Sequence, residues 1–357
     1  MSGQIAVLLG TTKGVFLLDG SPDRGDWAVR GPYCDGWPIN HVLGDPTTGT
    51  IWAAGGGEWY GAGVWRSDDL GQSWAVSTEG LPVGEGGIKT LWSLGRGRDR
   101  LYAGAKPAML FESDDRGASW RKVQGLNDHP SCPDWEPGAA GLVLHSIVAD
   151  PSDPGKLWVG ISAAGVFATE DGGATWERRN RRSNAATVGP QDHGDDVGLC
   201  VHNLVRAPLT HDLMYQQNHH GVHRSPDGGR TWTGIGGALP SGFGFPVAVH
   251  PRDPQTLWVF PLNGDSLGRF PPDASAAVWR SRSGGDDWQA LRNGLPGKDC
   301  FFTVLRQAMA VDAETPAGVY FGTNSGSVFA SRDEGDSWSE IARHLPTVLS
   351  VETLRVG

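Results

Sequence analysis

The sequence of 357 residues predicts an all-β protein, a seven-bladed propeller with four-stranded antiparallel blades. Three observations predict this fold. A short motif, Ser/Thr-x-Asp-x-Gly-x-x-Trp, recurs along the chain, its tryptophans are spaced by about one blade length, and the two chain ends supply complementary parts of one further blade. The composition agrees, because 53 glycines and 16 tryptophans suit many tight turns between strands that each bury an aromatic ring.

Five copies of the motif are complete and two are degenerate. The complete copies begin at Ser67, Ser113, Thr169, Ser225 and Ser331. A sixth copy begins at Ser281 and has Ser283 where the others have Asp, and "SPDRGDW" at 21–27 is a shortened seventh. From Trp74 to Trp338 the tryptophans of successive motif copies are 46, 56, 56, 56 and 50 residues apart, which fits a four-stranded blade with its loops.

The chemistry of the motif is that of a tight hairpin turn. The Asp carboxylate and the Ser or Thr hydroxyl accept hydrogen bonds from turn N–H groups, Gly adopts a conformation that other residues resist, and Trp buries against neighbouring strands. Segments such as "KLWVGISAAGVFATED" before the motif predict two strands, B and C. Runs that end in Asp-Pro or His-Pro, such as "VLHSIVADP" and "FPVAVHP", predict strand A, and strand D begins at the motif's Trp.

The two ends of the chain are expected to share one blade. "QIAVLLG" matches a strand B with no strand A before it, whereas "TVLSVETLRV" at 347–356 is an unattached strand A. Pairing them closes the ring and removes its free sheet edges. We therefore expect one domain over 1–357, with blades at approximately 346–357 plus 3–30, 38–77, 88–123, 143–179, 200–235, 245–291 and 302–341.

Composition excludes several classes of partner. The net charge of −10 argues against nucleic acid, and the one basic run, "ERRNRR", is interpreted as a solvated strand end. The start of the sequence does not resemble a secretory signal, and no apolar run approaches the roughly 20 residues of a membrane span. Reduced thiols in a cytoplasmic protein are expected for four widely separated cysteines, Cys34, Cys132, Cys200 and Cys300.

The repeats resemble the Asp-box, or bacterial neuraminidase, repeats of sialidases, sortilin-type receptors, some xyloglucanases and photosystem assembly factors. The resemblance implies a propeller whose boxes lie opposite the ligand funnel, which is lined by D-to-A loops, B-to-C turns and the start of strand A. Hydrolases, lyases and non-catalytic binders share this architecture. Classical exo-sialidase activity is not expected, because the sequence has no Arg-Ile-Pro segment, five tyrosines, and few funnel arginines beyond Arg269 and Arg306.

The funnel positions of strand A can be aligned on the Asp-Pro landmark. The same inward position is then occupied by Asn40, His145, His202 and Phe245, with looser matches at Trp92 and Gln307. The B-to-C turn "QQNHHG" adds Gln216, Asn218, His219 and His220. Two long D-to-A loops, 125–141 and 180–198, lead into the same strands, and long loops on a rigid scaffold commonly carry function.

The remaining candidates come from the other blades. Glu58, Lys89 and Arg306 join His145 and His202 as the candidate catalytic residues. The candidate binding residues are Asn40, His41, Trp59, Gln216, Asn218, His220, Asn263 and Asp265.

Two chemical hypotheses and a structural alternative account for these residues. In the first, a divalent metal in the central funnel is held by His145, His202 and His219 and activates water or polarises an oxygen. In the second, metal-free acid–base chemistry acts on a sugar or uronate, with His as the base and Lys89 or Arg306 binding a carboxylate. In the alternative, the histidines satisfy buried backbone groups near the axis.

The functional expectation is a protein that binds a small molecule or saccharide in its axial funnel, with hydrolase- or lyase-type chemistry of a glycosidase-like kind. A non-catalytic scaffold that presents the funnel or a blade edge to a protein partner is the alternative. Clustered titratable groups favour a ligand-binding role, because burying several of them together is costly.

Overall fold

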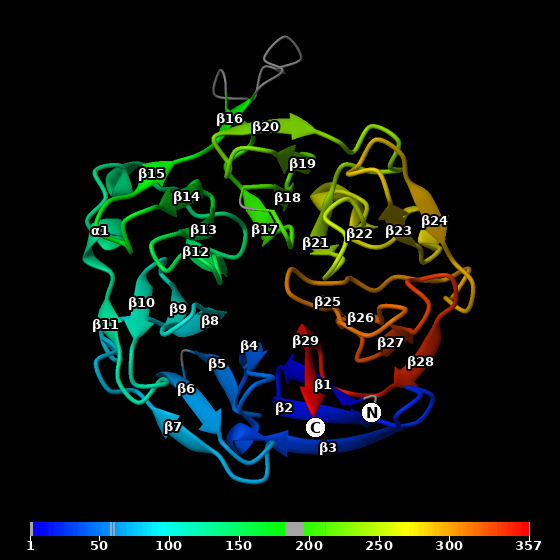
Figure 1. Ribbon diagram of the computed structural model, residues 1–357, viewed down its shortest axis with the longest axis horizontal. Coiled ribbons are helices and arrows are strands. Elements are labelled where there is room, and N and C mark those ends of the chain that lie inside the picture. Colours follow the sequence, from blue (N-terminus) through cyan, green and yellow to red (C-terminus); the bar gives the residue numbers. More distant parts are fainter. Residues whose placement is uncertain (1–2, 58, 60, 183–195, 211, 357) are drawn as a thin grey trace.

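The computed structural model describes residues 3–57, 59, 61–182, 196–210 and 212–356, and it confirms the predicted fold. Seven sheets, antiparallel except for one short parallel pair, are arranged around a central axis, and one edge strand of each lies nearest the axis (Figure 1). Six sheets have four strands, and one has a fifth short strand. Among these residues no helix is long and apolar enough to cross a membrane.

The blades are numbered from the one that holds both chain ends, and their strands are given from the axis outward. Blade 1 contains β29 (Val348–Val356), β1 (Gln4–Thr11), β2 (Gly14–Gly20) and β3 (Trp27–Tyr33). Blade 2 contains β4 (Ile39–Gly44), β5 (Ile51–Gly57), β6 (Gly61–Ser67) and β7 (Ala75–Ser77). Blade 3 contains β8 (Thr90–Arg96), β9 (Leu101–Lys106), β10 (Leu110–Ser113) and β11 (Arg121–Lys122). Blade 4 contains β12 (Val143–Ala149), β13 (Leu157–Ser162), β14 (Gly165–Thr169) and β15 (Glu177–Arg178).

The other three blades follow the same order. Blade 5 contains β17 (Val201–Arg206), β18 (Met214–Asn218), β19 (Gly221–Ser225) and β20 (Thr231–Gly234), with β16 (Arg181–Arg182) parallel to β20. Blade 6 contains β21 (Gly244–Val249), β22 (Leu257–Pro261), β23 (Val278–Ser281) and β24 (Gln289–Leu291). Blade 7 contains β25 (Met309–Val311), β26 (Val319–Gly322), β27 (Val328–Ser331) and β28 (Ser339–Ala342). The short helices are α1 (Gln124–Asn127), η1 (Cys34–Gly36), η2 (Cys132–Asp134), η4 (Asp265–Leu267) and η5 (Pro272–Ala274).

Both faces of a blade pack against neighbouring blades, which explains the strand composition. Every residue of β13 is buried, so this strand is a continuous run of apolar and small residues, LWVGIS. The outermost strand β7 is exposed at two of its three positions. The core therefore lies between the sheets, and no blade has a complete core alone.

The ring closes through pairing of the two chain ends, as the sequence predicted. β29 pairs antiparallel with β1, with Gln4 opposite Val356 and Gly10 opposite Ser350. An ion pair between Arg24 and Asp312 (3.0 Å) joins blade 1 to blade 7. Asp312 is almost completely buried and also accepts a hydrogen bond from the Tyr320 hydroxyl at 2.8 Å, so the junction is fastened beyond the strand pairing.

The repeated turn motif forms the connection between the third and fourth strands of a blade. In blade 4, Asp171 accepts hydrogen bonds from the Thr175 backbone N–H (2.9 Å) and hydroxyl (2.6 Å), while the Gly173 N–H donates to Thr169 Oγ1 (2.9 Å). The hydrogen bonds that Asp171 accepts lower its pKa to about 2, and the bond from the Thr175 hydroxyl is the largest cause. The carboxylate is a structural part of the turn.

The degenerate motif in blade 6 has kept its hydrogen bonds by exchanging two residues. Ser283 occupies the Asp position, and its hydroxyl accepts a hydrogen bond from the Asp287 N–H at 3.0 Å. The same hydroxyl donates to the Asp287 carboxylate at 2.8 Å. Position 287 is Ser or Thr in the complete copies, so the carboxylate has moved four residues along the turn.

Tryptophans of the second strands connect neighbouring blades to these turns. Trp52 Nε1 donates to the Arg116 carbonyl (2.9 Å), Trp158 Nε1 to the Gly228 carbonyl (2.8 Å) and Trp258 Nε1 to the Glu334 carbonyl (3.0 Å). Each acceptor lies in the turn motif of the next blade. The motif therefore shapes its own hairpin and also receives the preceding blade.

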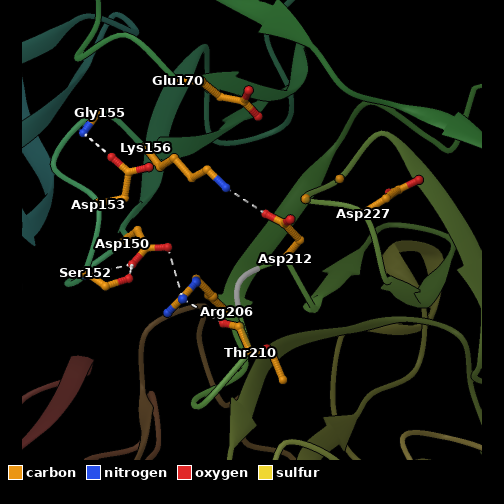
Figure 2. A network of polar contacts seen from close by, with 12 residues as sticks. Asp150, Ser152, Asp153, Gly155, Lys156, Glu170, Arg206, Thr210, Asp212 and Asp227 are labelled. Carbon is orange, nitrogen blue, oxygen red and sulfur yellow. Dashed lines mark hydrogen bonds and ion pairs between the residues drawn. The ribbon is translucent and has the colours of Figure 1, made fainter.

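Ion pairs reinforce the junction of blades 4 and 5 (Figure 2). Arg206 contacts the buried Asp150 at 3.0 Å, and Asp150 also accepts hydrogen bonds from the Ser152 N–H and hydroxyl. Lys156 contacts Asp212 at 3.2 Å in the same network.

Removal of residues 347–357 is expected to prevent cooperative folding, because β1 loses its inner neighbour and the ring is left open. Size-exclusion chromatography and thermal unfolding followed by circular dichroism measure this. A soluble, monomeric truncation product that is as heat-stable as the full chain would contradict it.

Exchanging the two side chains at the blade 6 turn is expected to be nearly neutral. Ser283→Asp alone places two carboxylates together, and Asp287→Ser alone removes the only carboxylate of the pair, so each single change is expected to cost roughly 0.5–1.5 kcal/mol. The double variant restores the arrangement of the complete motifs. Urea unfolding of the four proteins tests this, and additive single effects would count against the exchange.

Candidate functional site

The aligned funnel positions coincide with irregularities in the innermost strands. The pairing of β4 with β5 passes from Ile39 to His41 and skips Asn40. The corresponding shifts skip Trp92 in β8, His145 in β12 and His202 in β17, and the shift in β21 includes Phe245. A bulge leaves one residue out of the ladder and redirects its side chain. In blades 2 to 6 the inner strand thus leaves residues at its start out of regular pairing.

A segment of blade 7 extends toward the axis and contacts blades on the other side of the ring. This crosspiece, residues 301–308, precedes the short strand β25 and extends toward the middle of the ring (Figure 1). Gln307 Nε2 donates to the His145 carbonyl, and Asn203 Nδ2 donates to the Arg306 carbonyl at 2.7 Å. The Gln307 carbonyl accepts from the Val351 N–H at 2.8 Å. The crosspiece is therefore bonded to blades 1, 4 and 5.

An upper pocket of about 410 Å³ lies on the side of the D-to-A loops and B-to-C turns. This volume is within the range of small-molecule sites, roughly 300–1,000 Å³. Loop residues 138–140 and Ala163 form part of its wall. The other residues that line it are Cys200, His202, His219, His220, Phe243, Phe245, Asp265, Arg269 and Arg306.

Two arginines flank one aromatic ring in the upper pocket. The guanidinium carbon of Arg306 lies 4.9 Å from the Phe245 ring centre, and that of Arg269 lies 5.8 Å from it. Arg269 also pairs with Asp265 at 2.5 Å. Among the described residues the buried Nε of Arg306 has no hydrogen-bond partner. Burial lowers the pKa of Arg306 to about 10, so it stays charged at neutral pH.

His202 and Cys200 face each other at the floor of the upper pocket. His202 Nδ1 lies 2.6 Å from the Gly244 carbonyl, and because a carbonyl only accepts, Nδ1 carries the proton. Nε2 is then the atom with a lone pair, and it lies 3.7 Å from Cys200 Sγ. Burial, and next the charge of Arg306, hold the pKa of His202 well below its ordinary value.

His219 completes this side of the pocket from the turn after β18. Its ring centre lies 5.6 Å from that of His202, and its Nε2 lies 3.8 Å from Asp265 Oδ2. Burial lowers the pKa of His219, although the Asp265 carboxylate opposes this shift. One ligand atom from each of Cys200, His202 and His219 lies within 4.8 Å of the others.

A second cavity of about 650 Å³ lies on the other side of the crosspiece. His41, His145 and Glu352 line it. Burial lowers the pKa of His41 to about 4 and that of His145 to about 3, and it raises the pKa of Glu352 to about 7. His145 is fully buried and lies outside the group formed by Cys200, His202 and His219.

The structure distributes the other sequence-based candidates around the fold. Asn40 donates to Thr90 Oγ1 and the Leu91 carbonyl, and Asn218 bonds the Gly198 carbonyl and the His220 N–H, so both tie backbone segments together. Gln216 is buried in β18, and Asn263 begins the loop that carries Asp265. Lys89 and Trp59 are exposed and do not line either cavity. Glu58 and loop residues 183–195 lie outside the described residues.

Three residues that line the cavities, Cys200, Phe243 and Glu352, were not among the candidate catalytic, binding or metal residues. Cys200 lies two residues before His202, and this same-face spacing was the available signal. Phe243 precedes the bulge of β21 and leaves no signal of its own. Glu352 lies in β29, whose sequence VLSVETLRV mixes apolar and polar residues, so the sequence carried no distinct signal for it.

The chain is thus a seven-bladed β-propeller with a cationic, imidazole-lined pocket at its axis. No family model matches it. It is 24% identical over 222 residues to an oligoxyloglucan-reducing end-specific xyloglucanase of Emericella nidulans, covering 54% of this chain and 25% of that protein. It is 26% identical over 256 residues to a xyloglucanase of Paenibacillus sp, covering 65% and 23%. The chain therefore spans about a quarter of the length of these relatives.

Solved structures share the fold. An ancestral GH74 enzyme superposes with a TM-score of 0.59 at 18% identity, covering 85% of this chain and 38% of that one. YCF48 bound to D1 peptide superposes with a TM-score of 0.57 at 15% identity, covering 96% and 84%. At these identities the similarity establishes the architecture and leaves the activity to the pocket residues.

The buried neutral His145 is expected to make the protein acid-sensitive. Its folded pKa of about 3 lies below the ordinary 6.5, so between these pH values the unfolded chain binds a proton that the folded chain does not. This contribution is intact above pH 6.5 and is lost as pH falls, at about 1.4 kcal/mol per pH unit. His145→Gln should flatten the dependence of the unfolding free energy on pH by about that slope, as measured by urea unfolding at several pH values.

The matched control is the exposed His344→Gln, which should leave the slope as in the parent protein. Equal slopes for the parent and His145→Gln would show that His145 does not carry this linkage.

Proposed function

We propose that the upper pocket binds a saccharide bearing a carboxylate and that the protein acts on it by lyase-type proton transfer. The observation that carries the proposal is the pair of guanidinium groups, Arg306 and Arg269, at one aromatic ring. The relatives named xyloglucanases support a saccharide ligand.

Charge favours an anionic ligand. The pocket contains two arginines and one carboxylate, Asp265, among its described residues, so its side chains leave an excess of positive charge. Asp265 is paired with Arg269, whereas Arg306 keeps a buried N–H without a partner. A buried donor of this kind gains most from a charged acceptor such as a carboxylate.

The apolar part of the pocket suits a sugar ring. Phe243 and Phe245 meet edge to face with ring centres 5.2 Å apart, and both line the cavity. Aromatic rings beside a few convergent polar groups are the usual composition of a small-molecule site. A sugar acid can place its C–H face on the rings while its carboxylate contacts the arginines.

The number of carboxylates favours elimination over hydrolysis. Glycoside hydrolysis in its common form needs a pair of carboxyl groups, and Asp265 is the single one among the described pocket residues. Elimination needs a neutralised substrate carboxylate and a base. The C–H bond beside the carboxylate breaks and its proton passes to an imidazole. The electron pair forms a C=C double bond while the C–O bond to the leaving sugar breaks, and the leaving oxygen takes a proton from solvent. His220, exposed at the pocket, is the imidazole assigned to this role.

Binding of galacturonate and galactose, measured by calorimetry, tests the proposal. The parent protein is expected to bind galacturonate more tightly than galactose, and Arg306→Gln is expected to weaken galacturonate binding about 10- to 100-fold, since a charge-assisted hydrogen bond contributes roughly 1.5–3 kcal/mol. Galactose binding should not change.

The matched control is Arg343→Gln, which changes an exposed arginine of blade 7 that does not line the pocket. This variant should bind both sugars as the parent protein does. With polygalacturonate as substrate, His220→Gln should slow formation of the ultraviolet-absorbing unsaturated product while galacturonate still binds. Equal binding of the two sugars by the parent protein would reject the proposal.

A protein-binding role is the second candidate. Three large apolar side chains are exposed in B-to-C and D-to-A connections, which open on the same side as the pocket: Trp59 at 95%, Phe301 at 66% and Leu267 at 63%. Exposed apolar groups around a cavity are common at protein interfaces. A parent protein that binds no sugar acid would favour this role.

A further inference from the structure

The strongest unassigned feature is the convergence of one thiol and two imidazoles at the floor of the upper pocket. Cys200 directly precedes β17, His202 lies at the bulge of that strand, and His219 lies in the turn after β18. One ligand atom from each lies within 4.8 Å of the other two. Two adjacent strands and their turn thus bring three metal-type donors together without a local sequence motif.

The tautomer of His202 suits a metal ligand. Its Nδ1–H donates to the Gly244 carbonyl at 2.6 Å, which fixes the ring and leaves the Nε2 lone pair directed toward Cys200 Sγ, 3.7 Å away. Metal-binding histidines characteristically donate their other N–H to a carbonyl or carboxylate. His202 therefore already has the orientation that a metal site requires.

The two other donors also have outer partners. Cys200 Sγ lies 3.2 Å from the Ser162 hydroxyl, which can donate to a thiolate. His219 Nε2 faces Asp265 Oδ2 at 3.8 Å, so Nδ1 is the atom left for an ion when Asp265 holds Nε2. Cys200 and His202 thus have hydrogen-bond partners behind the site, and His219 has the Asp265 carboxylate nearby.

We propose that Cys200, His202 and His219 form a zinc site in the upper pocket, with its fourth position open to a ligand. One thiolate and two imidazoles are a donor set that zinc prefers, and three protein ligands with one open position are typical of a reactive rather than a structural site. Zinc bonds of about 2.0–2.3 Å place ligand atoms roughly 3.3–3.8 Å apart in a tetrahedron. The Cys200 to His202 pair already has this separation at 3.7 Å, and ligand atoms as far as 4.8 Å apart need to approach by roughly 1–1.5 Å.

The arginines of the pocket restrict the fourth ligand. A thiolate cancels only one charge of the ion, and Arg306 and Arg269 line the same cavity. An anion at the open position offsets this excess of positive charge. This assignment rests on the proposed function. If that function holds, the substrate carboxylate is the anion at the open position, and His220 remains available for proton transfer.

The metal site differs in one ligand from the set expected from sequence. His145 is fully buried and lines the lower cavity, so Cys200 takes its place. The two ligand sets predict opposite outcomes for two variants. Cys200→Ser should lose zinc only if Cys200 is a ligand, and His145→Gln should lose zinc only if His145 is a ligand.

Metal content and affinity test the site in untagged full-length protein. Elemental analysis after reconstitution with Zn²⁺ is expected to give one zinc per chain, and Co²⁺ is expected to produce a thiolate-to-cobalt charge-transfer band. Cys200→Ser should abolish this band, and both Cys200→Ser and His219→Gln should raise the zinc dissociation constant at least about 100-fold. His219 is partly exposed, so its variant is expected to fold if Cys200→Ser does not.

The matched controls are Cys132→Ser, at a partly exposed thiol outside the pocket, and His145→Gln. Both should keep parent affinity and the cobalt band. Absence of stoichiometric zinc in the folded parent, retention of zinc by Cys200→Ser, or loss of zinc from Cys132→Ser would each overturn the site.

A thiol-reactivity measurement separates the zinc site from a Cys–His nucleophile. Iodoacetamide should modify Cys200 slowly in the presence of Zn²⁺ and rapidly after chelation, whereas equal rates overturn the proposal. Galacturonate calorimetry on the zinc-free and zinc-loaded protein separates the two proposals. A protein that binds zinc but no sugar acid rejects only the proposed function. A protein that binds the sugar acid but takes up no zinc rejects only the metal site.

Discussion

The structure depends on the fact that a propeller blade has no core of its own. Strands such as β13 are buried on both faces, and the groups that bury them belong to other blades. Each interface therefore needs its neighbour, and the last interface forms only when β29 pairs with β1. The indole hydrogen bonds of Trp52, Trp158 and Trp258 also join neighbouring blades, since each indole donates to a turn of the next blade. Ring closure therefore completes the last of these interfaces.

Crowding at the axis follows from closure and creates the site. Seven inner strands converge there, and bulges release Asn40, His145 and His202 from regular pairing. What happens to each released side chain depends on its local partners. Asn40 ties backbone to backbone, His145 is buried beside the lower cavity, and His202 faces a thiol in the upper pocket. Equivalent positions have thus acquired three different roles.

The fold was predictable because hydrogen-bonded turns leave a local signature, and the shared blade follows from counting strands. The arrangement of the site was less predictable. Spacing aligned His145 with His202, but the crosspiece that separates their cavities is held by contacts of Gln307 and Asn203 that are remote in sequence. The exchange of Ser283 and Asp287 was also hidden, because one residue type was counted rather than the hydrogen bonds of the turn.

The crosspiece has a consequence for how solutes meet this protein. A ring of blades suggests an open central channel, but residues 306 and 307 form hydrogen bonds with blades 4 and 5 and lie between the two cavities. The result is two cavities with different linings, one with Cys200, His219 and Arg306 and the other with His145, Arg206 and Glu352. Because the two cavities share no lining residue, the two faces of the ring offer two separate sites, and a change at one lining leaves the other lining intact.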